Sequence, residues 1–397
     1  MSEAWRVLVL HNAYQLAGGE DAVVAAEVAL LREHGHAVAQ LTRHNDELAG
    51  MSPLNAALQA LWSRDSARRT AEAIAQHRAQ LVHVHNTWPL LSPSVYSACR
   101  HAGVPVVQTL HNFRLACPQA MFLRDGRLCT DCLGRLPWPA VQHACYRNSR
   151  AQTAVLATTL ALHRGLGTWQ RGVQRYIALN EFCRTRLIEA GLPAQRVVVK
   201  PHFVDAPDPA ESEARNGFLC VGRLAPEKGL QVLQDATRAL ALRGPTQAPL
   251  QVQVAGAGPL AAALAAGSAL PGGLQLLGEL PLAEVQQRMA RAQALVLPSI
   301  CLESFPRVLV EAFAAGLPVI ASRLGALAEL VQHGETGLLF APGDAQGLAE
   351  QMAWASAHPA EMARMGRRAR AVYEAEYTPQ RNLARLLAIY AEAAAQQ

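Results

Sequence analysis

The chain has 397 residues, of which 51% are hydrophobic and 17% are charged. This length is about two to three times that of a typical single domain, and the apolar content is enough for two cores. The net charge at pH 7 is only +5 and the basic residues are scattered, which argues against a dedicated nucleic-acid-binding protein and favours small partners that carry phosphate.

No apolar run reaches the ~18 residues that a membrane span needs. The N-terminus has one short apolar run, at 7–10, before polar residues intervene, so it does not have the pattern of a signal peptide. The sequence therefore predicts a cytoplasmic protein.

The first half of the chain alternates strand-like apolar runs with helical patterns. Such alternation is typical of a parallel sheet that is covered by helices, an α/β fold. The expected strands are Arg6–Leu10, Ala37–Leu41, Leu81–His85, Pro105–Leu110, Tyr176–Leu179 and Val197–Lys200.

A glycine pair, Gly18 and Gly19, follows the first expected strand. Glycines in such a turn let the backbone come close to the phosphates of a ligand. A glycine-rich turn between a strand and a helix is, however, more often only a turn. Asp21 is expected to cap the helix that follows.

Histidines mark the ends of two neighbouring expected strands. His111 stands at the carboxyl end of the strand at 105–110, where ligands of open α/β sheets bind. An isolated histidine is more often structural than catalytic. For His83 and His85, in the preceding strand, a buried and hydrogen-bonded place in the core is favoured over a place at the ligand.

Four cysteines lie in an insertion at 117–145, with the spacing Cys-x11-Cys-x2-Cys-x12-Cys. They can form a tetrahedral thiolate site for zinc, which would be structural because four thiolates leave no open position. The alternative is a set of unligated thiols in an irregular insertion, since disulfides are not expected in a reducing compartment. The candidate ligands are Cys117, Cys129, Cys132 and Cys145.

A basic stretch follows the cysteines, with five arginines between 147 and 175 that alternate with Tyr146, Trp169 and aliphatic residues. This pattern can rest on an anionic membrane surface or meet an acceptor that is linked to a polyprenyl diphosphate. A helix with a solvated basic face, packed on the first domain, is the simpler interpretation.

The segment 206–216 has two prolines and no apolar periodicity, and it is expected to link two domains. The sequence thus predicts a first domain at 1–205, a second at 206–378 and a terminal helix at 379–397. The expected strands of the second domain are Phe218–Val221, Leu250–Ala255, Leu274–Leu277, Ala294–Leu297, Pro318–Ala321 and Gly337–Phe340.

Two cations occupy the turn at 222–229, between the first strand of the second domain and a helical pattern that starts at Leu230. A strand, a glycine turn and two cations before a helix favour a grip on a diphosphate. Arg223 can bind two phosphate oxygens with its planar guanidinium, whereas Lys228 supplies a compact charge. The only other lysine of the chain is Lys200. A surface turn with solvated charges is the alternative.

The segment 297–320 places two carboxylates around the start of one buried helix. Ser304 is expected to cap this helix, with Pro306 in its first turn. Glu303 then precedes the helix and Glu311 lies about two turns into it, so both can face one cleft beyond the strand end. The alternative is that both glutamates are solvated surface charges.

These motifs together resemble the retaining family-four glycosyltransferases, over nearly the whole chain. The matching features are Gly-Arg-x4-Lys-Gly at 222–229, Gly-x-Gly-Pro at 256–259 and Glu-x7-Glu at 303–311. The resemblance implies the GT-B architecture, in which two Rossmann-like parallel-sheet domains face across a cleft and a C-terminal helix crosses back to the first domain. It also implies transfer of a sugar from a nucleoside-diphosphate sugar to a hydroxyl, with the anomeric configuration kept.

The resemblance assigns roles to residues of the second domain. Arg223 and Lys228 would hold the donor diphosphate. Glu311 would bind the ribose hydroxyls, and Glu303 would bind hydroxyls of the donor sugar. The donor-binding set is completed by Ser304, Phe305 and Pro306, the last two as the lining of the sugar pocket.

In the first domain, the resemblance implies that Gly18 and Gly19 close over the donor and that His111 interacts with the donor sugar. The acceptor would be a sugar or a lipid-linked glycan of oligosaccharide or exopolysaccharide assembly, which would allow peripheral contact with the inner membrane. No catalytic metal or redox cofactor is expected, because the two cations can offset the charge on the leaving diphosphate.

Other functions remain open on the residues alone. Gly256 and Gly258 after a strand, with Glu279 about twenty residues on, imitate a dinucleotide fingerprint and would suit an NAD-dependent oxidoreductase, but they follow the second strand of their domain rather than the first. A GT-B sugar-nucleotide epimerase or phosphorylase and an inactive nucleotide-sugar scaffold are further alternatives. A glycosidase would leave the two cations without a role.

Overall fold

The computed structural model describes residues 4–15, 18–205, 215–242, 251–268 and 273–396. Internal contacts divide the chain into two units. Unit 1 contains 1–122, 130–202 and 379–397, and unit 2 contains 123–129 and 203–378. Most of the expected linker, 206–214, lies outside the described residues.

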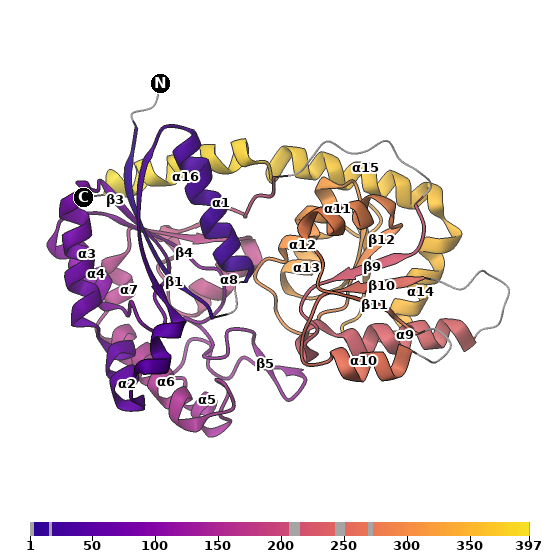
Figure 1. The fold of residues 1–397 in the computed structure, drawn as a ribbon, viewed down its shortest axis with the longest axis horizontal. Helices are drawn as coiled ribbons and strands as arrows, with labels where there is room; N and C mark the ends of the chain where they lie inside the picture. Colours follow the sequence, from indigo (N-terminus) through magenta and orange to yellow (C-terminus); the bar gives the residue numbers. More distant parts are fainter. Residues whose placement is uncertain (1–3, 16–17, 206–214, 243–250, 269–272, 397) are drawn as a thin grey trace. The chain divides into compact units, whose positions relative to one another are not determined.

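Unit 1 is built on a six-stranded sheet in the order β2-β1-β3-β4-β7-β8, in which every pair is parallel (Figure 1). All six strands expected in the first half are present. The apolar runs of the inner strands β1, β3, β4 and β7 are buried on both faces, as in a covered parallel sheet, whereas the edge strand β2 is mostly exposed or half-buried. The strands are β1 (Arg6–Ala13), β2 (Ala37–His44), β3 (Leu81–Asn86), β4 (Val106–Thr109), β7 (Arg175–Ala178) and β8 (Val197–Val199).

The terminal helix α16 (Pro379–Ala394) belongs to unit 1, as predicted, and contacts β4, β7 and helix α1 (Gly19–Glu33). Right-handed crossovers place α1 and the helices after β2 on opposite faces of the sheet. The other helices of unit 1 are α2 (Pro53–Leu61), α3 (Arg64–His77), α4 (Ser94–His101), α5 (Trp138–Gln142), α6 (Arg150–Gly165), α7 (Thr168–Gly172) and α8 (Glu181–Glu189), with 3-10 turns η1 (Asn45–Gly50) and η2 (Ala194–Arg196).

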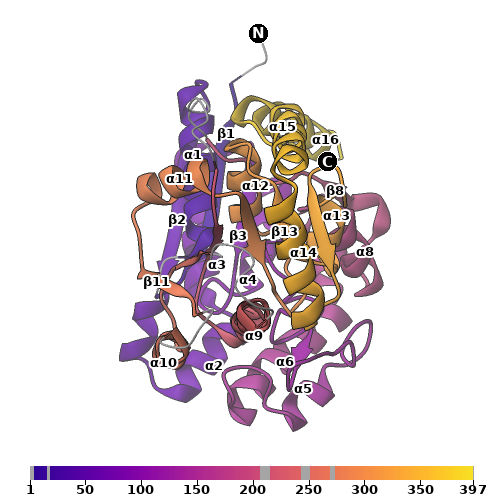
Figure 2. The ribbon, with the colours of Figure 1, turned by 90° about the vertical axis from the view of Figure 1, so that its right-hand side faces the viewer.

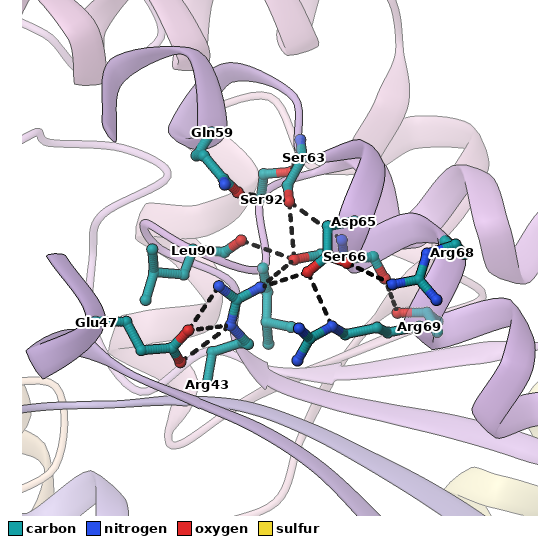
Figure 3. Close-up of polar contacts among 12 residues, drawn as sticks. Arg43, Glu47, Gln59, Ser63, Asp65, Ser66, Arg68, Arg69, Leu90 and Ser92 are labelled. Carbon is teal, nitrogen blue, oxygen red and sulfur yellow. Dashed lines mark hydrogen bonds and ion pairs between the residues drawn. The ribbon is translucent and has the colours of Figure 1, made fainter. Parts of the chain in front are cut away.

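A buried arginine ties the edge strand β2 to the elements that follow it (Figure 3). Arg43 forms ion pairs with Glu47 (2.7 Å) and Asp65 (3.3 Å), and it donates to Ser66 Oγ at 3.2 Å. Ser66 Oγ in turn donates to the Leu90 carbonyl at 2.9 Å. The guanidinium thus joins β2 to η1 and α3, and Ser66 extends the network to the loop after β3.

Unit 2 has a second six-stranded parallel sheet, in the order β11-β10-β9-β12-β13-β14. All six strands expected in the second half are present, and the hairpin of β5 (Leu123–Arg124) and β6 (Arg127–Leu128) was not expected. The six strands are β9 (Phe218–Val221), β10 (Val252–Ala255), β11 (Gln275–Gly278), β12 (Ala294–Leu297), β13 (Val319–Ser322) and β14 (Gly337–Phe340).

The sheet of unit 2 separates two apolar cores, because alternate strand residues enter different clusters. Leu295 and Leu297 of β12 pack in one cluster, and Ala294 and Val296 pack in the other. Helix α14 lies along β13 and β14 (Figure 2). The helices are η3 (Pro226–Lys228, 3-10), α9 (Leu230–Leu242), α10 (Ala261–Ser268), α11 (Leu282–Arg291), α12 (Arg307–Ala314), α13 (Gly325–Leu330), α14 (Ala345–Ala357) and α15 (Pro359–Glu376).

Each sheet has one point at which the strand order reverses. In unit 1 it lies between β1 and β3, and in unit 2 between β9 and β12. Loops that leave neighbouring strands at such a point diverge and open a crevice at the carboxyl edge, where ligands of these sheets bind. Among the described residues, no helix is long and apolar enough to cross a bilayer.

Candidate functional site

The loops that follow β9 and β12 meet at the reversal point of unit 2. The Ile300 N–H donates to the Glu227 carbonyl at 3.0 Å, which joins them directly. Gly229, between η3 and α9, has φ +69°, and a Cβ there would lie 1.8 Å from the Pro298 carbonyl oxygen. Only glycine permits this approach. The glycine that ends the cation turn therefore lets this turn lie directly against the loop after β12.

The Gly-x-Gly-Pro turn braces the cation turn from the other side. A Cβ on Gly256 would lie 1.9 Å from the Gly222 carbonyl oxygen, and the Leu224 N–H donates to the Ala257 carbonyl at 2.8 Å. The turn follows β10, which is not a strand of the reversal point. Its glycines are therefore explained by backbone packing, without a dinucleotide.

Lys228 and Glu303 form the centre of this site. Lys228 Nζ lies 2.9 Å from Glu303 Oε2, and Ser299 Oγ donates to Glu303 Oε1. Burial alone would raise the pKa of Glu303, but the charge of Lys228 and the hydrogen bonds from Ser299 and Lys228 lower it below its ordinary value. Burial would lower the pKa of Lys228, but the charge of Glu303 raises it. Both groups are therefore charged at neutral pH.

Arg223 pairs with Glu227, four residues on, and 64% of its side chain is exposed. The guanidinium therefore stands at the surface of the cation turn with donors to spare. Glu227 was not predicted as part of the site, although its i, i+4 spacing from Arg223 was a signal that could have found it.

The predicted start of the helix after β12 is wrong. Helix α12 begins at Arg307, with Pro306 as its N-cap residue, and Ser304 does not cap it. The reason is local, because proline disfavours helical backbone at the residue before it, here Phe305. Glu311 consequently lies about one turn into the helix, not two.

Glu311 pairs with Arg307 at 3.2 Å, a partner that the motif did not reveal. Burial raises the pKa of Glu311, and the charge of Arg307 offsets part of this effect. Phe305 packs against the apolar core, with its ring centroid 6.1 Å from that of Tyr377. Among the predicted residues, the structure joins Lys228 to Glu303 directly and gives Arg223 and Glu311 partners of their own.

In unit 1, the glycine pair begins helix α1 next to the reversal point. Gly18 is the N-cap residue, and its N–H donates to Asp21 Oδ2 at 2.8 Å. Asp21 therefore closes the helix end, as predicted in kind, but from the third helical position. Its other oxygen lies 2.8 Å from His11 Nε2. Gly18 and Gly19 are exposed, so their backbone can be approached.

Glu20, beside the glycine pair, was not predicted as part of a site. Its Oε2 accepts from Tyr14 Oη at 3.1 Å and from Asn112 Nδ2 at 3.4 Å. Burial raises the pKa of Glu20 to about 8, against the opposing effects of Tyr14 and Arg114. A carboxyl group that is largely protonated near pH 7 therefore lies at the edge of this loop.

His111 is buried and has imidazole neighbours at both ring nitrogens. His85 Nδ1 lies 2.9 Å from His111 Nε2, and His202 Nε2 lies 3.3 Å from His111 Nδ1. Burial, and then the neighbouring histidines, lower the pKa of His111 well below its ordinary value, so the ring is neutral. A cavity of about 60 Å³ beside it is lined by residues that include Trp88 and Arg114.

Two family models match the chain. The model described as Glycosyltransferase Family 4 matches residues 17–207, and the model described as Glycosyl transferases group 1 matches residues 215–358. The chain therefore belongs to the glycosyltransferase family that these two models describe. Together the two models cover most of both units, including the glycine pair, the cation turn and the helix that carries Glu311.

Similar proteins agree with this family. The amylovoran biosynthesis glycosyltransferase AmsK of Erwinia amylovora is 30% identical over 215 residues, which are 51% of this chain and 52% of that protein. The matches span between 19% and 52% of the length of the first curated relatives.

Solved structures show that the fold is shared. HepE of Anabaena in complex with UDP has a TM-score of 0.67 and 20% identity, covering 96% of this chain and 99% of that one. Sucrose-phosphate synthase from Thermosynechococcus elongatus has a TM-score of 0.71 and 17% identity, covering 99% and 100%. The predicted GT-B class, with two Rossmann-like parallel-sheet domains, is confirmed.

The glycosyltransferase chain also contains a buried polar cluster. The buried, hydrogen-bonded places of His83 and His85 were predicted, whereas their neighbours Glu27 and Lys200 were not. Glu27, His83 and His85 are, within the described part of the chain, the one group of three or more metal-binding side chains close enough to share an ion. Lys200 Nζ already lies 2.8 Å from Glu27 Oε2 and is fully buried. A divalent ion bound here would be repelled by this ammonium charge. The cluster is therefore better described as a buried carboxylate that is paired with a lysine.

The four cysteines of this glycosyltransferase are unbridged. Their thiols do not appear as a group within ligand distance in the part of the chain that the structure describes. The arrangement therefore gives no support to a structural zinc, which stays a prediction for metal analysis. Residues 123–129 of this insertion cluster with unit 2, and its remainder clusters with unit 1.

Proposed function

We propose that the protein is a retaining glycosyltransferase that moves a sugar from a nucleoside-diphosphate sugar to a hydroxyl acceptor. The observation that carries this proposal is the Lys228–Glu303 ion pair at the reversal point of a sheet that matches a glycosyltransferase model. Such a point is where an α/β sheet binds its ligand, and a cation beside a carboxylate suits a ligand with an anionic half and a hydroxyl-rich half.

The cations would act on the donor diphosphate. Lys228 has three N–H donors, of which Glu303 takes one, and 32% of its side chain is exposed. Arg223 adds a fork of donors that matches two phosphate oxygens. Because negative charge grows on the leaving oxygen in the transition state, these cations would stabilise it more than the ground state, without a catalytic metal. The UDP in the HepE complex supports a nucleoside diphosphate as the leaving group.

The carboxylates would orient the sugar and the ribose. Glu303 is held in its charged form by Lys228 and Ser299 and can accept from donor-sugar hydroxyls. Glu311 would accept from the ribose hydroxyls. Pro306, at the helix start, and Ser304 and Phe305, just before it, would complete this wall of the donor site. Gly18 and Gly19, at the reversal point of unit 1, are proposed as donor-binding residues through their exposed backbone.

The acceptor is proposed to be a lipid-linked or polysaccharide intermediate, which agrees with the polysaccharide named for AmsK. Unit 1 also exposes large apolar side chains on neighbouring helices, among them Leu58 on α2, Trp138 on α5 and Leu162 on α6. Exposed Arg147 and Arg150 lie at the start of α6, a combination that suits peripheral contact with an anionic membrane. The cytoplasmic location stays a prediction.

A panel of radiolabelled nucleotide sugars, offered with and without lipid-linked acceptors, tests the proposal. Transfer or slow donor hydrolysis is expected, with the anomeric configuration of the product kept. Binding of donors without any turnover would favour the scaffold alternative, and binding of NADH with no nucleotide-sugar binding would favour the oxidoreductase. Either result would reject the proposal, and an inverted product would reject its retaining part.

A further inference from the structure

A continuous run of polar side chains crosses the core of unit 1 beneath the strand ends. Lys200 Nζ lies 2.8 Å from Glu27 Oε2 and 3.1 Å from Asn382 Oδ1. On the other side of the carboxylate, Glu27 Oε1 faces His85 Nε2 at 3.6 Å, and His85 Nδ1 lies 2.9 Å from His111 Nε2. Helices α1 and α16, strand β3 and the segments after β4 and β8 supply these groups.

The carboxylate decides which nitrogen of His85 carries the proton. Glu27 Oε1 and His85 Nε2 are both buried, and neither has a hydrogen-bond partner among the described residues. A carboxylate oxygen is negatively charged and accepts only, so at this distance it repels a lone pair and favours the proton on the nitrogen that faces it. His83 Nδ1 also lies 3.3 Å from Glu27 Oε1, but Tyr390 Oη occupies that nitrogen at 2.8 Å and Thr109 Oγ1 occupies the other at 2.8 Å.

The position of the proton on His85 in turn determines the position of the proton on His111. Burial holds the pKa of both rings well below the ordinary value, so each ring is neutral and has a single N–H. A proton on His85 Nε2 leaves its Nδ1 as an acceptor, so His111 must donate from Nε2. His111 Nδ1 is then left with its lone pair, facing His202 Nε2 at 3.3 Å.

We propose that Glu27, held by Lys200, is a positioning residue that makes Nδ1 of His111 a hydrogen-bond acceptor for a sugar hydroxyl at the end of β4. The contact of Nδ1 with His202 is longer than that of Nε2 with His85, so Nδ1 is the position that a hydroxyl can take over. The sugar in this inference rests on the proposed function, whereas the tautomer does not.

Nuclear magnetic resonance of the full chain, with ¹⁵N-labelled histidines, reads the tautomers without any substrate. His85→Gln and His111→Gln identify the two sets of signals. We expect both rings of the wild-type protein to be neutral and protonated on Nε2. Protonation of His111 on Nδ1 would overturn the inference, and this measurement needs no variant at Glu27 that has to fold.

Variants then test the cause. In Glu27→Gln the amide can donate as well as accept, so we expect the Nδ1–H form of His85 or His111 to appear. Tyr390→Phe, which removes a hydroxyl from the neighbouring His83 and leaves Glu27 in place, should keep the wild-type tautomers. Unchanged tautomers in Glu27→Gln would overturn the role of Glu27.

The transfer assay tests the link to the ligand. We expect Glu27→Gln to lose about tenfold in kcat/KM and Tyr390→Phe to stay within about twofold of the wild-type protein. Altered tautomers with unchanged kcat/KM would overturn the role of His111 at the sugar. Failure of every donor in the wild-type protein would instead reject the proposed function and leave the tautomer result standing.

Discussion

Lys228 Nζ lies 2.9 Å from Glu303 Oε2, and this ion pair joins the two loops that leave the sheet of unit 2 at its reversal point. Each partner keeps the other charged in a site where burial alone would favour neutral forms. The pair therefore prepares a cation and a carboxylate next to each other before any ligand arrives.

Removal of either cation should weaken nucleotide binding. We expect Lys228→Ala and Arg223→Ala each to cost about 1.5 to 3 kcal/mol of affinity for the nucleoside diphosphate, the usual contribution of a hydrogen bond to a charged group. Isothermal titration calorimetry measures this. Arg364→Ala, which removes an exposed arginine of α15 from the same unit, is the matched control and should bind normally. Equal affinity in all three variants would refute the diphosphate grip.

Glu303→Gln should change how stability depends on pH. Because the pKa of Glu303 is lowered in the folded state, the ion pair stabilises the protein above the ordinary value of 4.5 and is lost as the pH falls through the lower folded-state value. We expect Glu303→Gln to be less stable than the wild-type protein at pH 7, with the difference shrinking below pH 4.5. Urea unfolding across this range measures it, and a constant difference would contradict the pairing.

Glu311→Gln should show the opposite trend. Burial raises the pKa of Glu311, so ionisation of this carboxyl lowers stability as the pH rises from 4.5 through the folded-state value. The free energy of unfolding of the wild-type protein, relative to Glu311→Gln, should therefore fall over that interval. Affinity for the nucleotide should drop about tenfold at pH 7, about 1.4 kcal/mol. A variant that binds nucleotide normally would remove Glu311 from the ribose site.

The buried Arg43 should matter far more than its exposed neighbour. Arg43→Ala removes the group that joins Glu47, Asp65 and Ser66, and we expect a loss of about 3 to 5 kcal/mol in the free energy of unfolding. Arg68→Ala breaks ion pairs on the exposed face of α3, where solvent screens the charges, and should cost far less. Similar losses for the two variants in urea unfolding would mean that the network is not structural.

Metal analysis decides the zinc prediction for the cysteine insertion. A structural site would hold close to one equivalent of zinc in the purified protein, and less than about a tenth of an equivalent would reject it. Cys129→Ser should release any bound metal. Cys99→Ser, which changes a buried cysteine of α4 outside the insertion, serves as the control.

The sheets could be predicted from the sequence because strands that are buried on both faces are continuous apolar runs, such as Val7–Leu10 or Ala294–Leu297. The cation turn could be predicted from another local signal, because Lys228 stands out in a chain that has only one other lysine. Both signals are local. Where a local signal was ambiguous, at Ser304, the predicted N-cap was wrong by two residues, because Pro306 determines the helix start.

The buried cluster of unit 1 could not be predicted in this way. Glu27 and Lys200 are 173 residues apart in the sequence. They meet only because α1 packs on a sheet whose strand order cannot be read from the pattern of apolar residues. Lysine scarcity marked Lys200 as unusual, but not its partner. His85 and His111 were each placed near a strand end, while their contact depends on the pairing of β3 with β4.

Unit 1 is discontinuous in the sequence, because α16 belongs to it but follows residues 203–378 of unit 2. Tyr390 of this helix is fully buried against His83, and Asn382 is a ligand of the Lys200 ammonium group. During translation, unit 1 therefore lacks part of its core until α16 has been synthesised, although most of its residues leave the ribosome before unit 2 does. Synthesis order and folding order are thus expected to differ in this chain.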